Sequence, residues 1–399
     1  MSVFSGNLLV AHGGGPTAVI NASLQGVIEE ARLHPGIKGI YGARFGVEGL
    51  LKEDFIDLGS EDDEIVLALS HTPASVLGSC RRKLTEADFP AVLEILKKYD
   101  IRFFFYNGGN DSMDTCNKIH LLAQKSGYEL RVIGIPKTID NDLAETDHCP
   151  GYGSAGRYAA ISALELWRDV ESLPIHVCVM EIMGRNAGWL TAAAALAKTS
   201  DEAGPQLIYL PERHFVEEEF LQDVSKWHDK LGGVLVAVSE GLTSPSGEPL
   251  ADSGLIDGFG HKVPGGVAQY LSDLIVRKLG IKSRSEKPGL LGRCSILMQS
   301  ETDREEARAV GAFAVRSAVK GESGYMAAFF RASQNPYLTE YTLVPLEKVA
   351  NAEKTFPAQW INERGNGVRD GFIEYLKPLV GSSLPDYAVL GKRPVPRVK

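Results

Sequence analysis

The 399-residue sequence lacks the marks of several protein classes. Its five cysteines show no CxxC spacing, so neither a zinc site nor a disulfide framework is expected. No apolar run reaches the ~18–20 residues that span a bilayer, and the N-terminus lacks the basic start and long apolar run of a signal peptide. Unpaired cysteines are typical of a reducing compartment, so we expect a cytoplasmic protein that makes no membrane contact.

Positive charge is also scarce. Lysine and arginine total 42 against 51 aspartate and glutamate residues, which gives a formal net charge of −9 at pH 7. Because no long basic run offsets this charge, we expect no nucleic acid partner. The glycine-rich loop 12–17 matches neither the GxGxxG nor the GxxxxGKS/T fingerprint of common nucleotide-binding loops. An anionic ligand would therefore have to be bound by a local group of cations.

Glycine, in contrast, is abundant, and many of the 42 glycines follow short apolar runs. Apolar runs typical of strands alternate with stretches typical of helices, which predicts an α/β protein with parallel sheets. The length exceeds that of one ordinary domain, so two domains are expected. Further along, we expect an alanine-rich helix over 190–198 and a less regular C-terminal stretch with a final helix over 371–379.

Three predicted strands end in polar loops. Strand 7–11 leads into 12–17, strand 102–106 into 107–112, and the apolar run 132–135 into 136–142. In an open parallel sheet the carboxyl ends of the strands share one edge, where ligands bind. Glycine-rich turns from a strand into a helix also point backbone N–H groups at an anion. We therefore expect the three loops to lie together at one ligand-binding edge.

The loop 136–142, with the sequence PKTIDND, carries the densest chemistry. The hydroxyl of Thr138, the ammonium of Lys137 and two carboxylates suit the transfer of a charged group onto an alcohol. One of Asp140 and Asp142 can take the alcohol proton, and the other can hold a metal ion or orient the first. A polar turn with local caps explains the same residues, and the heptapeptide alone leaves both interpretations open.

Four other charged residues are candidates for binding or selecting a ligand. Arg81 follows a Gly-Ser turn and can bind a phosphate bidentately, although a run of cations is also typical of a solvated face. Asp111 can cap the helix that follows it, or it can repel a phosphate from the turn. Arg185 and Glu240 each follow a later predicted strand and are candidates for a second ligand-binding lobe.

Five motifs occur in order along the chain: GGGPTAVIN at 13–21, LGSCR at 77–81, GGNDS at 108–112, PKTIDND at 136–142 and MGRNAGW at 183–189. In combination they resemble those of the phosphofructokinases. The resemblance runs from about residue 7 to at least residue 328, and the segments 341–354 and 362–367 look like one subgroup. It implies two Rossmann-like three-layer αβα domains with the active site in the cleft between them. The implied units are a donor-binding lobe over 1–150, a sugar-phosphate-binding lobe over 151–292, and a C-terminal segment over 293–399 that packs on both.

The family divides by phosphoryl donor at two positions. ATP-using members have glycine where this sequence has Asp111 and Lys137, whereas pyrophosphate-using members have the same aspartate and lysine. An Asp111 carboxylate would repel the α-phosphate of ATP, and Lys137 can stabilise a transferring phosphoryl group. The resemblance therefore implies reversible phosphorylation of fructose 6-phosphate by pyrophosphate, assisted by Mg²⁺, in a homodimer or homotetramer.

The resemblance also implies a role for each matched residue. Asp140 corresponds to the general base for the C1 hydroxyl of the sugar, and Asp142 to the residue that supports magnesium and that base. The implied sugar-phosphate contacts are Thr138, Met183, Gly184, Arg185, Glu240, Arg284 and Arg293, with His176 as a contact from a neighbouring subunit. The implied pyrophosphate contacts are Gly14, Arg81 and Ser112.

Some positions depart from the family pattern. Asn110 stands where an aspartate near magnesium is common, so metal binding there would be weaker or through water. Leu290 stands where a histidine or tyrosine usually contacts the 6-phosphate, and losing such a hydrogen bond costs about 1.5–3 kcal/mol. Gln25 and Glu29 replace arginines with which bacterial ATP-dependent members bind allosteric nucleotides, so nucleotide allostery is not expected.

Three alternatives stay open at this point. The chain could be an ATP-dependent 6-phosphofructokinase, which Asp111 and Lys137 disfavour. It could be a pyrophosphate-dependent kinase of another sugar phosphate, such as sedoheptulose 7-phosphate, which Leu290 favours. It could also be a non-catalytic regulatory subunit, but such a subunit would have no need of Asp140 and Asp142.

Overall fold

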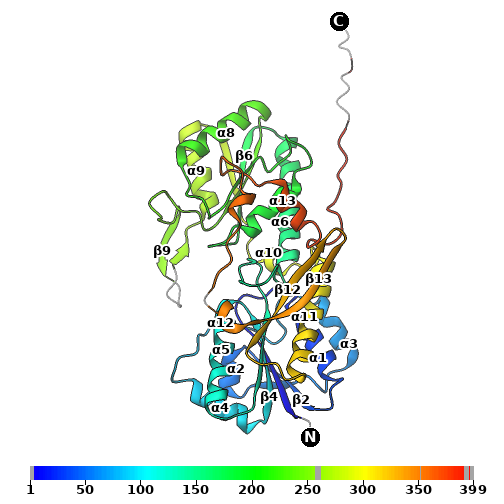
Figure 1. Ribbon diagram of the computed structural model, residues 1–399. Coiled ribbons are helices and arrows are strands. Elements are labelled where there is room, and N and C mark those ends of the chain that lie inside the picture. The colour runs from blue at the N-terminus through cyan, green and yellow to red at the C-terminus, as the bar shows by residue number, and fades with distance from the viewer. Residues whose placement is uncertain (1–3, 257–261, 351, 391–394, 396–399) are drawn as a thin grey trace.

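The computed structural model describes residues 4–256, 262–350, 352–390 and 395. The chain forms two lobes, one above the other in Figure 1, and each lobe is built on a β-sheet flanked by helices. The lower lobe combines blue and cyan elements from the N-terminal part with yellow and orange elements from beyond residue 300. The upper lobe is mostly green. The predicted α/β fold with two lobes is confirmed.

The lower lobe contains a seven-stranded sheet of the order β13-β12-β5-β4-β1-β2-β3. The pairs β12–β5, β5–β4, β4–β1 and β1–β2 are parallel, and β3 and β13 pair antiparallel at the two edges. The strands are β1 (Gly6–His12), β2 (Ile37–Ala43), β3 (Phe55–Asp57), β4 (Ile101–Gly108), β5 (Arg131–Pro136), β12 (Tyr325–Gln334) and β13 (Tyr337–Pro345).

Both faces of this sheet are covered, because successive residues of a strand point to opposite faces. On β4, Phe103 and Phe105 pack into a core with α1 and α11, whereas Phe104 and Tyr106 pack into a second core with α4 and α5. Burial on both faces explains why β4 is apolar without alternation. The helices of this lobe are α1 (Ile20–Ala31), α2 (Val47–Lys52), α3 (Asp63–Ala68), the 3₁₀ turn η1 (Leu69–His71), α4 (Phe89–Lys98), α5 (Asn110–Lys125), α11 (Glu301–Val319) and α12 (Leu346–Val349).

Helices α1 and α11 approach each other backbone to backbone. A Cβ atom added at Gly26 would lie 1.9 Å from the carbonyl oxygen of Arg308, and one at Gly311 would lie 2.1 Å from that of Ser23. Only glycine leaves room for this contact. Helix α11, which begins at residue 301, therefore belongs to the same lower lobe as β1 and α1.

The upper lobe contains a parallel sheet of the order β11-β6-β8-β7. On β6, Cys178 and Met180 face a core with α6 and α13, whereas Val177 and Val179 face a core with α8 and α9. The strands are β6 (His176–Ile182), β7 (Leu207–Tyr209), β8 (Val234–Ser239) and β11 (Lys282–Glu286), with a hairpin of β9 (Asp252–Ile256) and β10 (Lys262–Pro264). The helices are α6 (Tyr152–Ser172), α7 (Trp189–Ala192), η2 (Ala193–Ala197), α8 (Glu217–Leu231), α9 (Val267–Leu279), α10 (Leu291–Cys294), η3 (Ala358–Trp360) and α13 (Asp370–Leu376).

Two local predictions are wrong. The helix expected over 190–198 is one α-helical turn, α7, followed by the 3₁₀ segment η2. Its buried alanines pack closely on α6, where a Cβ at Gly156 would lie 3.4 Å from that of Ala193, so tertiary packing overrides alanine's helix propensity. The C-terminal stretch, expected to be less regular apart from its final helix, contains the long hairpin β12–β13.

The C-terminal part of the chain contributes to both lobes. The hairpin pairs with β5 at Tyr325 and Met326 and then continues toward the upper lobe (Figure 1). Further on, Phe372 and Leu376 of α13 lie in the core of the upper lobe. The domain boundaries at 150 and 292 stay a prediction.

Candidate active site

The three polar loops lie side by side because β5, β4 and β1 are neighbours in the sheet. The strands β1 and β4 are in register at His12 and Asn107, so their loops begin at the same level. The main-chain N–H of Lys137 donates to the carbonyl oxygen of Gly108 at 3.1 Å, which joins the 136–142 loop to the 107–112 loop. The loops therefore share one edge, as the sequence predicts.

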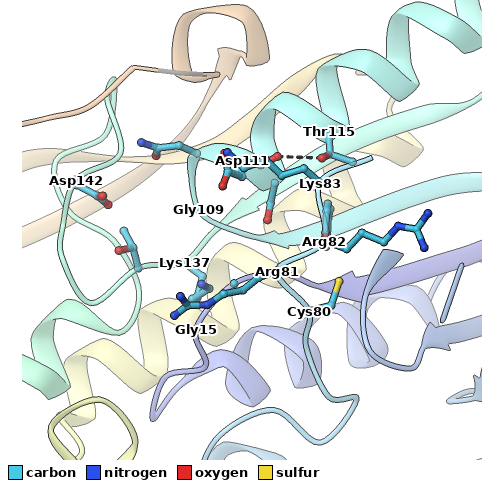
Figure 2. A pocket seen from close by; sticks show the side chains of 15 residues that line it. Gly15, Cys80, Arg81, Arg82, Lys83, Gly109, Asp111, Thr115, Lys137 and Asp142 are labelled. Atoms are coloured by element: carbon cyan, nitrogen blue, oxygen red, sulfur yellow. Dashed lines mark hydrogen bonds and ion pairs between the residues drawn. The ribbon is translucent and has the colours of Figure 1, made fainter. Parts of the chain in front are cut away.

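A first cavity of about 570 Å³ opens between these loops (Figure 2). The N–H of Gly14 donates to the carbonyl oxygen of Cys80 at 2.9 Å, and Ser79 Oγ donates to that of Gly14 at 2.6 Å. These bonds hold the 77–81 segment, and with it Arg81, against the glycine-rich loop. A Cβ at Gly14, whose φ is +76°, would lie 3.1 Å from Lys137 Nζ, so glycine lets the lysine approach the loop. The predicted residues that line this cavity are Gly14, Arg81, Asn110, Asp111, Ser112, Lys137, Thr138 and Asp142.

Asp111 lies in the first turn of α5, where Figure 2 shows it close to Lys83. Asp111 Oδ1 forms an ion pair with Lys83 Nζ at 2.9 Å, and both side chains are 67% exposed. Thr115 Oγ donates to the carbonyl oxygen of Asp111 at 2.9 Å. The sequence gave Lys83 no individual role, yet its ammonium balances the Asp111 carboxylate at the exposed side of the cavity.

A second cavity, of about 450 Å³, adjoins the first and lies between the two lobes. Arg81, Lys137, Thr138 and Asp142 line both cavities, so the two form one continuous cleft. The predicted residues that line only the second cavity are Asp140, Met183, Arg185, Glu240, Leu290 and Arg293.

The charged groups of the cleft are strongly coupled. Lys137 is 4% exposed. Burial lowers its pKa to about 8, although Asp142 and Asp140 act in the opposite direction. Burial, then the charges of Asp142 and Glu240, raise the pKa of Asp140 to about 7, while Lys137 opposes this shift. Burial likewise raises the pKa of Asp142. Near neutral pH the cleft therefore offers a carboxylate ready to accept a proton beside an ammonium.

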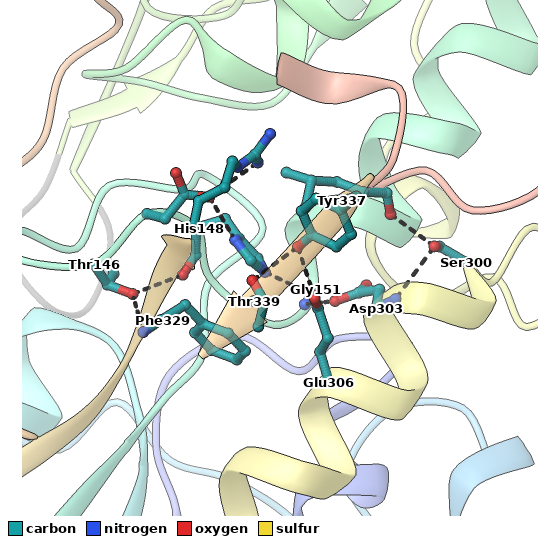
Figure 3. Close-up of polar contacts among 12 residues, drawn as sticks. Thr146, His148, Gly151, Ser300, Asp303, Glu306, Phe329, Tyr337 and Thr339 are labelled. Atoms are coloured by element: carbon teal, nitrogen blue, oxygen red, sulfur yellow. Dashed lines mark hydrogen bonds and ion pairs between the residues drawn. The ribbon is translucent and has the colours of Figure 1, made fainter. Parts of the chain in front are cut away.

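The loop that carries these carboxylates is fixed by a buried cluster behind the cleft (Figure 3). His148 lies with Nδ1 2.8 Å from Asp147 Oδ2 and Nε2 2.7 Å from Glu306 Oε2. Burial lowers the pKa of His148, but the two carboxylates outweigh it and raise the pKa to about 9, so the imidazolium donates to both. Tyr337 OH donates to Glu306 Oε1 at 2.7 Å. The end of the loop is thus bound to α11 and β13.

Asp303 of α11 connects this region to the upper lobe. Its Oδ1 accepts from the N–H of Gly151 at 2.8 Å (Figure 3). Its Oδ2 accepts from the N–H of Ser154 at 2.8 Å. Both donors belong to the start of α6, where backbone N–H groups lack partners within the helix. The carboxylate therefore caps α6 from the other lobe.

With this geometry in place, the chain can be compared with known proteins. The family described as Phosphofructokinase matches residues 7–318. The chain belongs to the phosphofructokinase family. A relative from Methylococcus capsulatus, named pyrophosphate–fructose 6-phosphate 1-phosphotransferase, is 42% identical over 408 residues, with 98% of this chain and 97% of the relative covered. A relative from Alkalicoccus urumqiensis, named sulfofructose kinase, is 36% identical over 359 residues, covering 89% of this chain and 92% of the relative.

A solved structure is also similar. The crystal structure of a pyrophosphate-dependent phosphofructokinase from Marinobacter aquaeolei has a TM-score of 0.87 to this chain and 38% sequence identity. The match covers 96% of this chain and 94% of that one. The family and the phosphofructokinase-type fold predicted from the sequence are thereby confirmed.

The cleft of this phosphofructokinase suits Mg²⁺, which prefers oxygen ligands and usually keeps several waters. Asp140 Oδ1 and Asn110 Oδ1 are buried and lack a hydrogen-bond partner among the described residues. Together with the Asp142 carboxylate they offer oxygen donors that a hydrated cation can use. Across the described ranges, no group of three or more His, Cys, Asp or Glu could hold a metal by itself, so substrate phosphates and water would have to complete the coordination.

Three predicted residues do not line the cleft. The N–H of Gly184 donates to Glu240 Oε1 at 3.4 Å and so supports the cleft from behind. His176 is buried at the start of β6, at the opposite end of that strand from the 183–185 loop. Arg284 is exposed on the neighbouring strand β11, beside Cys178. The predicted substrate contacts of His176 and Arg284 stay predictions, because this chain does not bring them to its own cleft.

Sequence reasoning missed several cleft residues. Besides Lys83, these include Asn186 and Glu353, which line the second cavity and are joined by a hydrogen bond of 2.8 Å from Asn186 Nδ2 to Glu353 Oε1. Glu353 belongs to the tail motif that the sequence ties to one subgroup of phosphofructokinases, so a signal was present without a role attached to it.

Over the described part of the chain, no helix is long and apolar enough to cross a membrane.

Proposed function

We propose that this member of the phosphofructokinase family reversibly transfers a phosphoryl group from inorganic pyrophosphate to the C1 hydroxyl of fructose 6-phosphate. The observation that carries the proposal is the pair Asp111 and Lys137 lining one cavity, where the charge pattern suits a short inorganic donor. Four relatives at 41–43% identity with this donor in their names support it.

In the proposed reaction, the C1 oxygen attacks one phosphorus of pyrophosphate while the bridging oxygen leaves with the other phosphate. Asp140 accepts the hydroxyl proton, which its pKa of about 7 allows near neutral pH. Lys137 stabilises charge on the transferring phosphoryl group, and Arg81 holds the rest of the donor beside Gly14. Arg185, Arg293 and Glu240 would bind the sugar phosphate. Mg²⁺, which Asp142 and Asn110 would help hold, neutralises phosphate charge when bound.

An assay with two donors tests the proposal. Purified protein, fructose 6-phosphate and Mg²⁺ are given either pyrophosphate or ATP, and fructose 1,6-bisphosphate is measured. We expect turnover with pyrophosphate. Turnover with ATP alone would make the chain an ATP-dependent enzyme, and turnover with neither donor would favour a regulatory subunit.

A second acceptor deserves a place in this assay because of Leu290. Its side chain lines the second cavity and is 62% exposed. Because a leucine side chain has no hydrogen-bond donor, it cannot donate to a 6-phosphate. Sedoheptulose 7-phosphate is the competing acceptor that the sequence suggests, and sulfofructose is the one that the name of the Alkalicoccus relative suggests. A kcat/KM higher for either than for fructose 6-phosphate would reassign the acceptor while leaving the donor unchanged.

The Asp111→Gly variant tests donor selection. Removing the carboxylate also frees the Lys83 ammonium for a third phosphate. We expect turnover with ATP to rise about tenfold or more, which corresponds to ~1.4 kcal/mol of relieved repulsion. The Asp111→Asn variant is the matched control, because it removes the charge and keeps the volume. If neither variant gains turnover or affinity with ATP, Asp111 does not select the donor.

We further propose a cytoplasmic homodimer or homotetramer. All five cysteines are free thiols, as is typical of a reducing compartment. Leu290, Leu291 and Leu297 are exposed by 62%, 63% and 97%, and exposed apolar groups of this kind support contact between copies. Analytical ultracentrifugation at assay concentration measures the number of subunits.

A further inference from the structure

A short segment after α12, residues 352–356, contacts two loops that line the cleft. We call this segment the strap. One loop follows β5 and spans residues 136–148, and we call it the catalytic loop. The other follows β6 and spans residues 183–189. Glu353 forms a β-bridge with Leu143, and the main-chain N–H of Lys354 donates to the carbonyl oxygen of Asp142 at 2.7 Å. Further along, the N–H of Phe356 donates to Glu212 Oε1 at 2.8 Å. The strap therefore begins on the catalytic loop of the lower lobe and continues into the upper lobe.

Lys354 makes the closest connection between the two loops. Its Nζ donates to the carbonyl oxygens of Thr146 at 3.0 Å and Asp147 at 2.9 Å, so its side chain spans the catalytic loop whose main chain it already holds at Asp142. Its carbonyl oxygen accepts from Trp189 Nε1 at 3.1 Å, and its ammonium lies 5.0 Å from the centre of the same indole ring. Trp189 ends the MGRNAGW loop, which carries Arg185.

Residues next to Lys354 lie in the cleft or hold its catalytic loop. Glu353 lines the second cavity, where Asn186 holds it. Tyr375 OH donates to the same carbonyl oxygen of Asp147 at 2.8 Å and accepts from Asn141 Nδ2 at 3.1 Å. Asn141 lies between the two catalytic carboxylates and has a φ of +54°, a conformation that needs support from its surroundings. Two side chains thus hold the loop: Tyr375 at Asn141 and Asp147, and Lys354 at Thr146 and Asp147 as well as at the backbone of Asp142.

We propose that Lys354 is a positioning residue for phosphoryl transfer, which holds the Asp140–Asp142 turn in place against the loop that carries Arg185. The inference rests on the function proposed above. Lys354 lines neither cavity of the cleft, and its hydrogen bonds go to backbone carbonyl oxygens of the catalytic loop. Because small displacements of reacting groups lower rate constants strongly, loss of its amine should affect kcat more than substrate binding.

The experiment compares Lys354→Met, Lys354→Arg and Lys348→Met in the full-length protein. Methionine keeps the length of the stem and removes the amine, arginine keeps a donor group, and Lys348 is an exposed lysine on α12 just before the strap. We expect Lys354→Met to lower kcat about 10- to 100-fold with KM for fructose 6-phosphate changed less than about threefold. Lys354→Arg should recover part of kcat, and Lys348→Met should match the wild type.

Hydrogen exchange gives a second readout that needs no turnover. Amides of 140–148 should exchange faster in Lys354→Met than in Lys348→Met, while amides of β4 stay unchanged. A wild-type protein inactive with pyrophosphate and fructose 6-phosphate would overturn the proposed function, and hydrogen exchange would still decide the role of Lys354. A lower melting temperature with kcat retained would reduce Lys354 to a structural residue. Unchanged exchange in 140–148 would show that Lys354 does not hold this loop, and would overturn the inference. If Lys354→Met does not fold, the same comparison is made with Lys354→Gln.

Discussion

Replacing Asp140 with asparagine is expected to lower kcat for phosphorylation of fructose 6-phosphate by about 10²- to 10⁴-fold. Asparagine keeps the shape of the side chain but cannot accept the proton of the C1 hydroxyl. The neighbouring carboxylates do not substitute easily, because Asp142 is shared with the donor cavity and Glu240 lies on the other lobe. Steady-state kinetics with saturating pyrophosphate measures the effect, and a variant within threefold of the wild type would exclude Asp140 as the base.

The same carboxyl group predicts how activity and stability depend on pH. Burial and the neighbouring charges raise the pKa of Asp140 to about 7, so kcat/KM of the wild type should fall as the pH drops below 7 and the base is protonated. The stability of the fold changes with pH in the opposite direction to kcat/KM. Between about pH 4 and pH 7 the folded state binds a proton that the unfolded state has lost, so ionisation of Asp140 destabilises the fold as the pH rises through this range. Despite its low kcat, Asp140→Asn should therefore melt at or above the wild-type temperature at pH 8, and a clearly lower melting temperature would contradict this.

Lys137→Met is expected to lower kcat/KM with pyrophosphate by about 10²- to 10³-fold, the range seen when a preorganised charge contact to a transition state is removed. Methionine fills the space of the stem in this buried position but removes the ammonium. Arg81 and Arg293 remain in the cleft, so some binding of anions should survive. The matched control is Lys83→Met, which removes an exposed, paired ammonium from the same cavity and should cost far less.

The pKa of Lys137 also predicts that the pH–activity profile falls on its alkaline limb. Because burial lowers its pKa to about 8, the ammonium is lost above that pH, and wild-type activity should fall there. In Lys137→Met the residual activity should no longer show this limb. A limb that persists in the variant would mean that another group is responsible.

The catalytic edge could be predicted because it follows from local rules. Strands 7–11, 102–106 and 132–135 were recognisable as apolar runs, and parallel strands bring their carboxyl ends to one edge. Asp111 and Lys137 then stood out because the resemblance to the phosphofructokinases divides the phosphoryl donors at these two positions. The contact between Asp111 and Lys83 could not be predicted, because three consecutive cations give no sign of which one turns toward α5.

Long-range contacts set the limit of sequence reasoning. The strap reaches Asp142 from more than 200 positions away, and no local pattern in 352–356 indicates that approach. The hairpin β12–β13 was missed because its alternation of buried and exposed residues begins only after the apolar run at 326–329. For Arg284 and His176 the matched motif gave a residue type, but only the sheet shows that both lie outside the chain's own cleft.

The pairing of β12 with β5 has a consequence for how the protein is made. β5 carries the catalytic turn, and its edge is completed only by residues near 325, as the bond from Val132 N–H to Ser323 Oγ across 191 positions illustrates. At a synthesis rate of about 5–20 residues per second, that edge waits on the order of 10–40 s on the ribosome for its partner. Unpaired edges invite association with other strands. The lobe that starts the chain therefore cannot finish folding until the chain is almost complete.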